Sequence, residues 1–222
     1  MKTCLIVTGG TMDLAFAGSF LKQNTFDMVV AVDGGLEHLK PLGLLPDAVV
    51  GDFDTVSQDV LMEYRKLEQV AWEIHQPEKD ETDTELAIET AIGMGAESIT
   101  ILGGTGGRID HMLANIHLLA GCLERGLSAS MVDGQNRLYI LDGETIFYRD
   151  RVHGKYLSFI PLTERVEGIT LTGFKYPLHE KTITIGREAG LCVSNELVEE
   201  TGCISFDSGL LICVESGDRA KE

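Results

Sequence analysis

Two carboxylates in the first half of the chain stand two positions apart, in the sequence Gly51-Asp-Phe-Asp54. If the backbone there is extended, the side chains of Asp52 and Asp54 point to the same side. Such a pair suits a hard divalent cation, because Mg²⁺ binds carboxylate oxygens together with waters and substrate phosphates. The alternative is structural, with Asp54 and Ser57 capping the helix that follows. We therefore treat Asp52 and Asp54 as candidate metal ligands.

A second acidic segment precedes a helical pattern further along the chain. Thr82 and Glu85 have the spacing of a capping box, and Asp83 in the first turn would complement the helix dipole. That cap needs neither Lys79 nor Asp80. The carboxylate of Asp80 could therefore complete a Mg²⁺ shell, and the ammonium of Lys79 could meet a phosphate.

A glycine-rich turn connects a short apolar run, residues 98–102, to a helical pattern that begins at Ile109. Such a unit gathers free backbone N–H groups at the positive end of the helix dipole, and a phosphate can approach because Cβ atoms are absent. Arg108 would add a positive charge there, beside Asp110. The turn lacks the features of a P-loop and of the dinucleotide fingerprint, so a tight turn without a ligand is equally consistent with its glycines. The candidate phosphate-binding residues are Gly103, Gly104, Thr105, Gly106, Gly107 and Arg108.

Two further candidate sites lie in segments with turn composition. Asp33 begins an Asp-Gly-Gly sequence after another apolar run, and Asp-Gly is by itself a strong turn signal. Ser194 and Asn195 interrupt the strand-like run 191–193, where a hydroxyl and an amide could read the donor and acceptor edge of a heterocycle. Turn formation alone also explains each of these segments.

The elements that would position these residues alternate through residues 1–135. The apolar runs are 5–7, 28–32, 48–50 and 98–102, and the segments with helical spacing are 14–21, 36–42, 56–67, 84–94 and 109–123. Strands that alternate with helices predict a parallel sheet covered on both faces. In that architecture ligands bind beyond the carboxyl ends of the strands. The loops expected to share this edge are 9–10, 33–35, 51–54, 76–83 and 103–108.

The pattern changes in the second part of the chain, where hydrophobic and polar residues alternate with little helical spacing. The alternating segments are 156–160, 169–171, 182–185 and 204–206. This alternation predicts a small antiparallel sheet or sandwich. We therefore expect a Rossmann-like α/β domain over residues 1–135 and an all-β sandwich domain over residues 136–222. The strand-like segments 129–133 and 137–141 could belong to either domain.

The composition argues against several classes of protein. The net charge is −17, from 18 basic and 35 acidic residues, whereas a nucleic-acid surface needs clustered lysine and arginine. No run reaches the roughly 18 apolar residues that a membrane-spanning helix needs. The five cysteines have neither paired metal-binding spacing nor an even disulfide framework. We expect reduced thiols in a cytoplasmic protein that binds neither nucleic acid nor membrane.

The order of the motifs is more specific than any one of them. Asp-Gly-Gly, Gly-Asp-Phe-Asp, Lys-Asp-x-Thr-Asp-x-Glu, Gly-Gly-x-Gly-Gly-Arg-x-Asp-His-x-x-Ala-Asn and Ser-Asn follow one another between Asp33 and about Gly209. This ordered set resembles the thiamine pyrophosphokinase family. The resemblance implies an N-terminal α/β domain, a C-terminal β-sandwich and a homodimer with active sites between the subunits. It also implies a reaction in which ATP and thiamine give AMP and thiamine diphosphate, with Mg²⁺ required.

The resemblance also implies roles for individual residues. The acidic metal and phosphate site of the family matches Asp52, Asp54, Asp80 and Asp83. The phosphate contacts match Lys79, Arg108 and the glycine turn, with Asp110 in the same constellation, and the region that holds the thiamine pyrimidine matches Ser194 and Asn195. Some members place a tryptophan after the final Leu-Leu pair as a stacking surface. Here Ile212 follows that pair, so Phe206 or another residue would have to replace it.

Two other functions fit parts of the pattern. One is another Mg²⁺-dependent phosphoryl or pyrophosphoryl transferase that acts on a different small alcohol. The second is a non-catalytic ATP sensor, in which the glycine turn binds the nucleotide and the β domain transmits the signal. Four converging aspartates favour a transferase, because one or two carboxylates would suffice to hold Mg²⁺ in a sensor.

Overall fold

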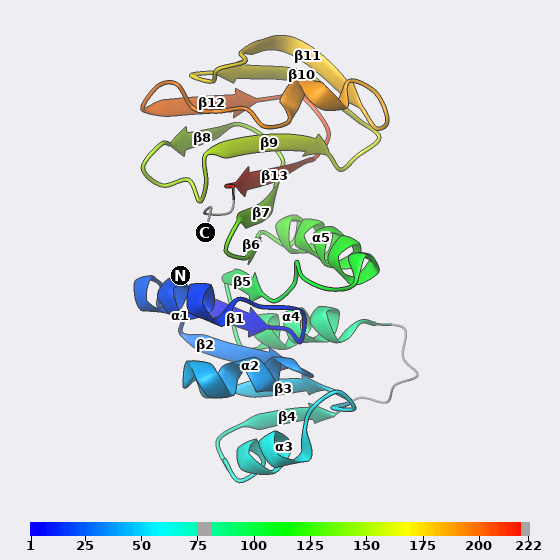
Figure 1. Ribbon diagram of the computed structural model, residues 1–222. Coiled ribbons are helices and arrows are strands. Elements are labelled where there is room, and N and C mark those ends of the chain that lie inside the picture. Colours follow the sequence, from blue (N-terminus) through cyan, green and yellow to red (C-terminus); the bar gives the residue numbers. More distant parts are fainter. Residues whose placement is uncertain (75–80, 219–222) are drawn as a thin grey trace. The chain divides into compact units, whose positions relative to one another are not determined.

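The computed structural model describes residues 1–74 and 81–218 and divides the chain into two compact units. The first unit is Met1–Gly134 and the second is Gln135–Glu222 (Figure 1). Within the described residues, no helix combines the length and the apolar composition needed to cross a membrane.

The first unit contains a parallel sheet with the strand order β4-β3-β2-β1-β5-β6. Its strands are β1 (Thr3–Val7), β2 (Met28–Val32), β3 (Ala48–Gly51), β4 (Ala71–Ile74), β5 (Ser98–Leu102) and β6 (Ser128–Val132). The central strands are almost wholly buried, which is why they form continuous apolar runs in the sequence. The segment around residues 129–133 belongs to this unit as β6.

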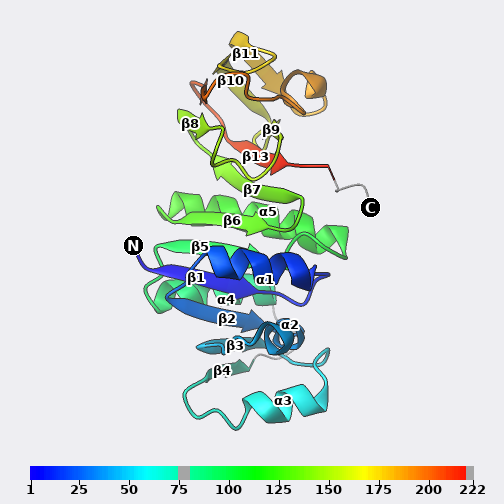
Figure 2. The same cartoon turned by 60° about the vertical axis from the view of Figure 1, so that its left-hand side comes forward.

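Helices cover both faces of this sheet (Figure 2). They are α1 (Leu14–Gln23), α2 (Gly35–Leu42), α3 (Gln58–Tyr64), α4 (Asp83–Gly93) and α5 (Ile109–Glu124). The helices α1 to α3 lie on one face, where Leu36, Leu39 and Val60 join a buried cluster with Leu5 and Val49 of the sheet. On the other face α4 packs beside α5. The predicted doubly covered parallel sheet is therefore confirmed.

Two predicted helix caps have different outcomes. The Thr82 hydroxyl accepts a hydrogen bond from the backbone N–H of Glu85 at 3.2 Å, which confirms the threonine half of the capping box. Ser57 occupies the N-cap position of α3, but its side chain makes no capping hydrogen bond. Its backbone N–H instead donates to the carboxylate of Glu37 at 2.8 Å. The structural explanation that Asp54 and Ser57 cap this helix is therefore wrong for the serine.

The second unit consists of two antiparallel sheets that enclose one hydrophobic core. Their strands are β7 (Asn136–Leu141), β8 (Thr145–Tyr148), β9 (Tyr156–Pro161), β10 (Arg165–Thr172), β11 (Leu178–Thr184), β12 (Thr201–Ser205) and β13 (Leu211–Ser216). One sheet has the order β7-β13-β9, and the other has the order β11-β10-β12-β8. The rings of Phe147, Phe159 and Phe174 meet in the core at centroid distances of 5.6–6.0 Å. The predicted all-β sandwich is confirmed.

One strand-like run in this unit is not a strand. Residues 191–193 alternate too briefly to fix a conformation, and the chain there forms a 3₁₀ helix, η1 (Ala189–Cys192). The side chain of Cys192 is buried in the sandwich core. Leu191 and Val193 on either side of it are exposed, so burial explains only the central residue of the run.

Candidate functional site

Four loops lie at the carboxyl ends of neighbouring parallel strands in the first unit. They follow β1, β2, β3 and β5, and we call this edge, residues 8–13, 33–34, 52–57 and 103–108, the carboxyl rim. These strands pair in parallel, so their carboxyl ends face the same way and the loops share one edge. The fifth predicted loop, 76–83, is described only from Glu81 onward.

Asp33 is the most constrained carboxylate at the carboxyl rim. Its backbone lies in the left-handed region with φ at 44°, and its Oδ1 accepts a hydrogen bond from the backbone N–H of Phe53 at 3.0 Å. A Cβ atom on Gly51 would overlap the Asp33 carboxylate, so glycine is required where β3 ends. The Asp-Gly-Gly and Gly-Asp-Phe-Asp motifs therefore contact each other directly, through the Asp33 carboxylate, Gly51 and the N–H of Phe53.

The environment of Asp33 is strongly acidic. Burial raises the pKa of its carboxyl group to about 6, although the hydrogen bond from Phe53 acts in the opposite direction. The negative charges of Asp83 and Asp52 raise the pKa further. Charge repulsion of this kind requires that the groups lie close together. The carboxylates of Asp83 in α4, Asp33 after β2 and Asp52 after β3 are therefore neighbours.

Asp52 and Asp54 are not related by extended backbone, and that prediction is wrong. Phe53 between them adopts φ at 63°, in the left-handed region, and its ring is buried edge-on against Trp72 with 5.3 Å between centroids. Burial of this ring stabilises a tight turn. The Asp52 carboxylate accepts a hydrogen bond from the backbone N–H of Asp54 at 3.2 Å, while Asp54 itself is exposed. Asp52 and Asp54 therefore lie in a turn, and their side chains do not share one side of an extended strand.

The predicted metal ligands are only partly described. Asp52 and Asp54 lie at the carboxyl rim, and Asp83 begins α4 close to Asp33 of that rim. Asp80 and the predicted phosphate contact Lys79 fall outside the described residues. Over residues 1–74 and 81–218, no three His, Cys, Asp or Glu side chains are already placed to hold a metal ion. The donor set consists of carboxylate oxygens, which fits Mg²⁺ better than a softer metal.

The glycine turn packs closely against other parts of the first unit. A Cβ atom on Gly103 would lie 2.6 Å from the carbonyl oxygen of Thr8, and one on Gly104 would lie 3.0 Å from the sulfur of Met131. Gly107 is different, because a Cβ atom there would meet nothing closer than 4.0 Å. Close packing explains Gly104, and close packing together with a φ of 80° explains Gly103. At Gly107 the space is open, and a φ of 97° is what favours glycine.

Two side chains fix the shape of this turn. The Thr105 hydroxyl donates to Asp133 at 2.6 Å, and the buried Asn115 amide donates to the carbonyl of Gly104 at 3.2 Å. Within the described chain, the backbone N–H groups of residues 104–107 donate no hydrogen bond. The turn therefore holds its donors in a fixed arrangement and leaves them available to an anion.

Arg108 and Asp110 form a bidentate ion pair where α5 begins. The guanidinium donates from Nη2 to Oδ2 at 2.6 Å and from Nε to Oδ1 at 3.1 Å. Hydrogen bonding from Arg108 lowers the pKa of Asp110 to about 2, with a smaller contribution from the backbone N–H of His111. Both side chains are exposed, so the pair contributes little to stability, but it orients the guanidinium beside the glycine turn.

Ser194 and Asn195 in the second unit have different environments. Asn195 is only 1% exposed, and its Oδ1 accepts from the backbone N–H groups of Tyr176 and Glu196, both at 3.0 Å. Its Nδ2 donates to the carbonyl of Tyr176 at 2.9 Å. Ser194 is exposed with φ at 56°, and its backbone N–H donates to the hydroxyl of Ser158 at 2.9 Å. The amide predicted to read a heterocycle is thus committed to the backbone, and the serine hydroxyl lies at the surface.

Glu196, which follows this turn, was not among the predicted site residues. Its carboxylate pairs with Lys175 at 2.9 Å and with Lys155 at 3.3 Å, and hydrogen bonding from Lys175 lowers its pKa. Sequence spacing could not reveal this group, because the lysines come from distant segments. Phe206, the suggested stacking residue, is partly buried against the sandwich core.

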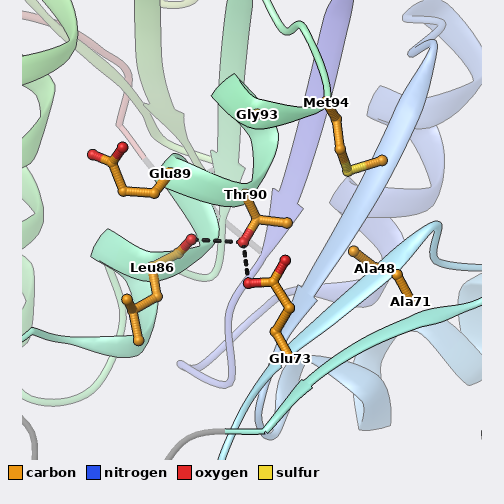
Figure 3. Close-up of a pocket in the computed structure, with 8 residues that line it drawn as sticks. All are labelled: Ala48, Ala71, Glu73, Leu86, Glu89, Thr90, Gly93 and Met94. Carbon is orange, nitrogen blue, oxygen red and sulfur yellow. Dashed lines mark hydrogen bonds between the residues drawn. The ribbon is translucent and has the colours of Figure 1, made fainter.

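A surface pocket of about 420 Å³ lies elsewhere in the first unit (Figure 3). It runs along α4 from Leu86 to Met94 and includes Ala48 and Ala71, the first residues of β3 and β4. The hydroxyl of Thr90 in this pocket donates to Glu73 at 2.8 Å (Figure 3). None of the predicted site residues lines it, and it lies at the amino ends of those strands.

Comparisons with known proteins agree with both units. The sequence model for the thiamin pyrophosphokinase catalytic domain matches residues 21–131, and the one for the thiamin pyrophosphokinase vitamin B1 binding domain matches residues 144–211. Thiamine pyrophosphokinase of Bacillus subtilis (strain 168) is 38% identical over 222 residues, which cover 98% of this chain and 100% of the relative.

Solved structures give the same result. The crystal structure of thiamine pyrophosphokinase from Bacillus subtilis aligns with a TM-score of 0.85 at 34% identity, over 98% of this chain and 100% of that chain. The thiamin pyrophosphokinase from Geobacillus thermodenitrificans aligns with a TM-score of 0.83 at 34% identity, over 98% and 99% of the two chains. The chain therefore belongs to the thiamine pyrophosphokinase family.

Proposed function

We propose that this protein is a thiamine pyrophosphokinase, which transfers the pyrophosphoryl group of ATP to the hydroxyethyl oxygen of thiamine. The products are thiamine diphosphate and AMP. Family membership supports the reaction, and the match of the second unit to a vitamin B1 binding domain supports thiamine as the substrate. The structural observation that carries the proposal is the carboxyl rim, where three acidic side chains and the glycine turn occupy one edge of the sheet.

The carboxyl rim is suited to bind Mg²⁺-ATP. We assign Asp52, Asp54, Asp80 and Asp83 to Mg²⁺. The charges of Asp83 and Asp52, which add to burial in raising the pKa of Asp33, support this assignment, because a nearby cation would offset repulsion among these carboxylates. When bound, Mg²⁺ neutralises charge on the transferring phosphates.

The chain's own donors complete the phosphate site. The N–H groups of the glycine turn bind phosphate oxygens, and Arg108 adds a guanidinium that Asp110 holds in place. The hydroxyethyl oxygen attacks the β-phosphorus in line, so that an O–P bond forms there and the bond to the AMP oxygen breaks. Positioning and charge neutralisation provide most of the rate increase in such a transfer. The alcohol proton passes to a carboxylate, for which Asp54 and Asp83 are the candidates, or to solvent.

In the second unit, we assign the exposed Ser194 hydroxyl to contact with thiamine. Asn195 is assigned a positioning role, since its amide is already bonded to Tyr176. The acidic character of the protein favours thiamine binding, because thiamine carries a cationic ring and the net charge is −17. A homodimer with shared active sites and a cytoplasmic location remain predictions, and size-exclusion chromatography with light scattering measures the first.

The decisive experiment incubates the purified protein with Mg²⁺-ATP and thiamine and identifies the products by mass. Equal amounts of AMP and thiamine diphosphate are expected. ADP as the matched product would indicate a different phosphoryl transfer, and ATP binding without thiamine-dependent turnover would indicate a sensor. Omitting thiamine, and separately omitting Mg²⁺, controls for background hydrolysis of ATP.

A further inference from the structure

The loop after β1, residues 9–12, packs backbone to backbone against the glycine turn. A Cβ atom on Gly10 would overlap the carbonyl oxygen of Gly103, and one on Gly106 would lie 2.5 Å from the carbonyl oxygen of Thr11. No side chain could fit between the two loops at these points. Because packing is this close, a displacement of the β1 loop must also displace the glycine turn.

The same loop packs against the segment after β2. A Cβ atom on Gly9 would lie 3.0 Å from the Cα of Gly34, and one on Gly35 would overlap the carbonyl oxygen of Val7. The β1 loop therefore lies between the Asp33 segment and the glycine turn. Its position affects both the acidic and the phosphate-binding parts of the carboxyl rim.

One side chain anchors the β1 loop to a helix. Nε2 of the half-buried His38 lies 2.9 Å from the carbonyl oxygen of Gly10. A carbonyl oxygen can only accept, so Nε2 carries the proton and donates. His38 belongs to α2, which packs on β1 and β2 and carries Leu36 and Leu39 into the hydrophobic core. The hydrogen bond thus connects the glycine-rich β1 loop to a helix that is anchored in the core.

We infer that His38 is a positioning residue for phosphate binding and acts through Gly10. This rests on the proposed function, in which the glycine turn binds the phosphates of ATP. Glycine-rich backbone has wide conformational freedom, so its N–H groups bind a phosphate well only when neighbouring groups fix their directions. Thr105 and Asn115 fix one side of the turn, and the β1 loop held by His38 fixes the other.

The test measures binding of Mg²⁺-ATP by calorimetry in the absence of thiamine, with turnover measured separately. Loss of one hydrogen bond in His38→Ala should weaken ATP binding by about threefold to tenfold. The KM for thiamine should change less than the affinity for ATP, since thiamine is assigned to Ser194 and the β1 loop contacts the glycine turn assigned to ATP. His38→Gln should restore most of the affinity, because its side-chain N–H can reach the same carbonyl. The matched control is His117→Ala, on the exposed side of α5.

A second readout is independent of nucleotide and activity. Amide hydrogen exchange at Thr8, whose N–H donates to the carbonyl of Leu102 at 3.0 Å beside the β1 loop and the glycine turn, should be faster in ligand-free His38→Ala than in the wild type and should return towards wild type in His38→Gln. Gly10→Ala, which leaves His38 intact, should weaken ATP binding at least as much, because the new Cβ displaces the carbonyl of Gly103. Its control is Gly121→Ala, where the added Cβ meets open space.

The outcomes separate the two ideas. Wild-type ATP affinity in His38→Ala together with unchanged exchange at Thr8 would overturn the positioning role. Weak binding in both His38→Ala and His38→Gln would also count against it, because the donor would then be irrelevant. A wild-type protein that bound no ATP would refute the proposed function, while the exchange comparison would still decide whether His38 fixes the turn.

Discussion

The carboxyl rim and the Ser194–Asn195 turn hold their polar groups in opposite ways. At the carboxyl rim, glycines allow loops to pack backbone against backbone. The Asp54 carboxylate is exposed at the surface of that packing, and Asp52 is partly exposed. In the Ser194–Asn195 turn, a polar side chain is itself buried. The Asn195 amide accepts from the N–H of Tyr176 and donates to its carbonyl, as the backbone of a paired strand would. The difference shows that a polar residue in a motif can have a structural role, as Asn195 does, and that a glycine can be required because no Cβ atom fits at its position.

This comparison leads to a sharp separation of expected effects. Removing the carboxylate of Asp52 or Asp54 should affect chemistry and spare stability, since these side chains are partly or fully exposed and support little of the fold. Removing the Asn195 amide should affect stability first. The comparison would be wrong if substitutions at the carboxyl rim lowered stability and substitution of Asn195 lowered activity alone.

The largest expected effect is that of Asp52→Asn. Turnover should fall by at least about 10²-fold, as expected when a ligand of an essential metal is lost. The thermal midpoint should stay close to that of the wild type, because Asp52 is partly exposed and its hydrogen bond to the Asp54 N–H can be kept by asparagine. Steady-state kinetics and circular dichroism measure the two quantities.

The matched control for this variant is Asp59→Asn, an exposed aspartate in the first turn of α3. It removes the same charge from the same unit without touching the carboxyl rim, and activity should stay within about twofold of the wild type. Near-normal activity of Asp52→Asn, or an equal loss in both variants, would show that Asp52 is no metal ligand.

The second prediction separates the two residues of the turn. Asn195→Ala leaves the N–H and the carbonyl of Tyr176 without their buried partners, which should lower the free energy of unfolding by about 1–3 kcal/mol. Ser194→Gly removes only an exposed hydroxyl, and glycine readily adopts the left-handed φ of 56° at this position. Its stability should therefore change little, while the KM for thiamine rises about threefold to tenfold through loss of one hydrogen bond.

Thermal melting and thiamine kinetics on both variants decide this point. If Asn195→Ala kept wild-type stability and lost thiamine binding, the amide would be a ligand group and the assigned positioning role would be wrong. If Ser194→Gly left the KM unchanged, the surface hydroxyl would have no part in binding thiamine.

The sequence predicted the architecture well because burial determines residue type in this fold. β2 and β3 are covered on both faces and so appear as Met28–Val32 and Ala48–Val50, with hardly a polar residue. β4 escaped prediction because it is an edge strand with mostly exposed residues, and Ala71–Ile74 carries no buried pattern. The run at 191–193 was misinterpreted because a short apolar segment fits a strand or a helical turn equally well.

The site was predictable in its parts and unpredictable in its contacts. The Asp-Gly pair at Asp33 is a strong turn signal in the sequence. The contact between the Asp33 carboxylate and Gly51 depends on the pairing of β2 with β3, which no local pattern encodes. The hydrogen bond from His38 to Gly10 is equally remote in sequence and joins a helix to the loop of another strand. The sequence likewise contained no sign that the Asn195 amide is buried and hydrogen-bonded to the backbone of Tyr176.

The smallest expected effect concerns charge, which acts with opposite signs in the two regions. Asp33 has a pKa raised to about 6, chiefly by burial and then by neighbouring carboxylates, whereas Glu196 has a lowered pKa because two lysines bind it. A raised folded-state pKa means that the folded protein holds the proton more tightly than the unfolded chain. The contribution of Asp33 to stability is therefore fully present below the unfolded pKa of about 3.9 and is lost as the pH rises towards 6.

Glu196 must behave in the opposite way, since its contribution is present above the unfolded pKa of about 4.3 and is lost as the pH falls through its lower folded value. In Mg²⁺-free buffer, Asp33→Asn should therefore gain stability relative to the wild type as the pH rises from about 4 to about 7. Glu196→Gln should lose stability relative to the wild type over a lower range, as the pH rises towards about 4.3 from below. Denaturation followed by the fluorescence of Trp72, the single tryptophan, reports on the first unit, and hydrogen exchange at residues 175–176 and 194–196 reports on the second. A stability difference between Asp33→Asn and the wild type that did not change with pH would show that the Asp33 carboxyl group lacks the raised pKa expected from its burial and its acidic neighbours.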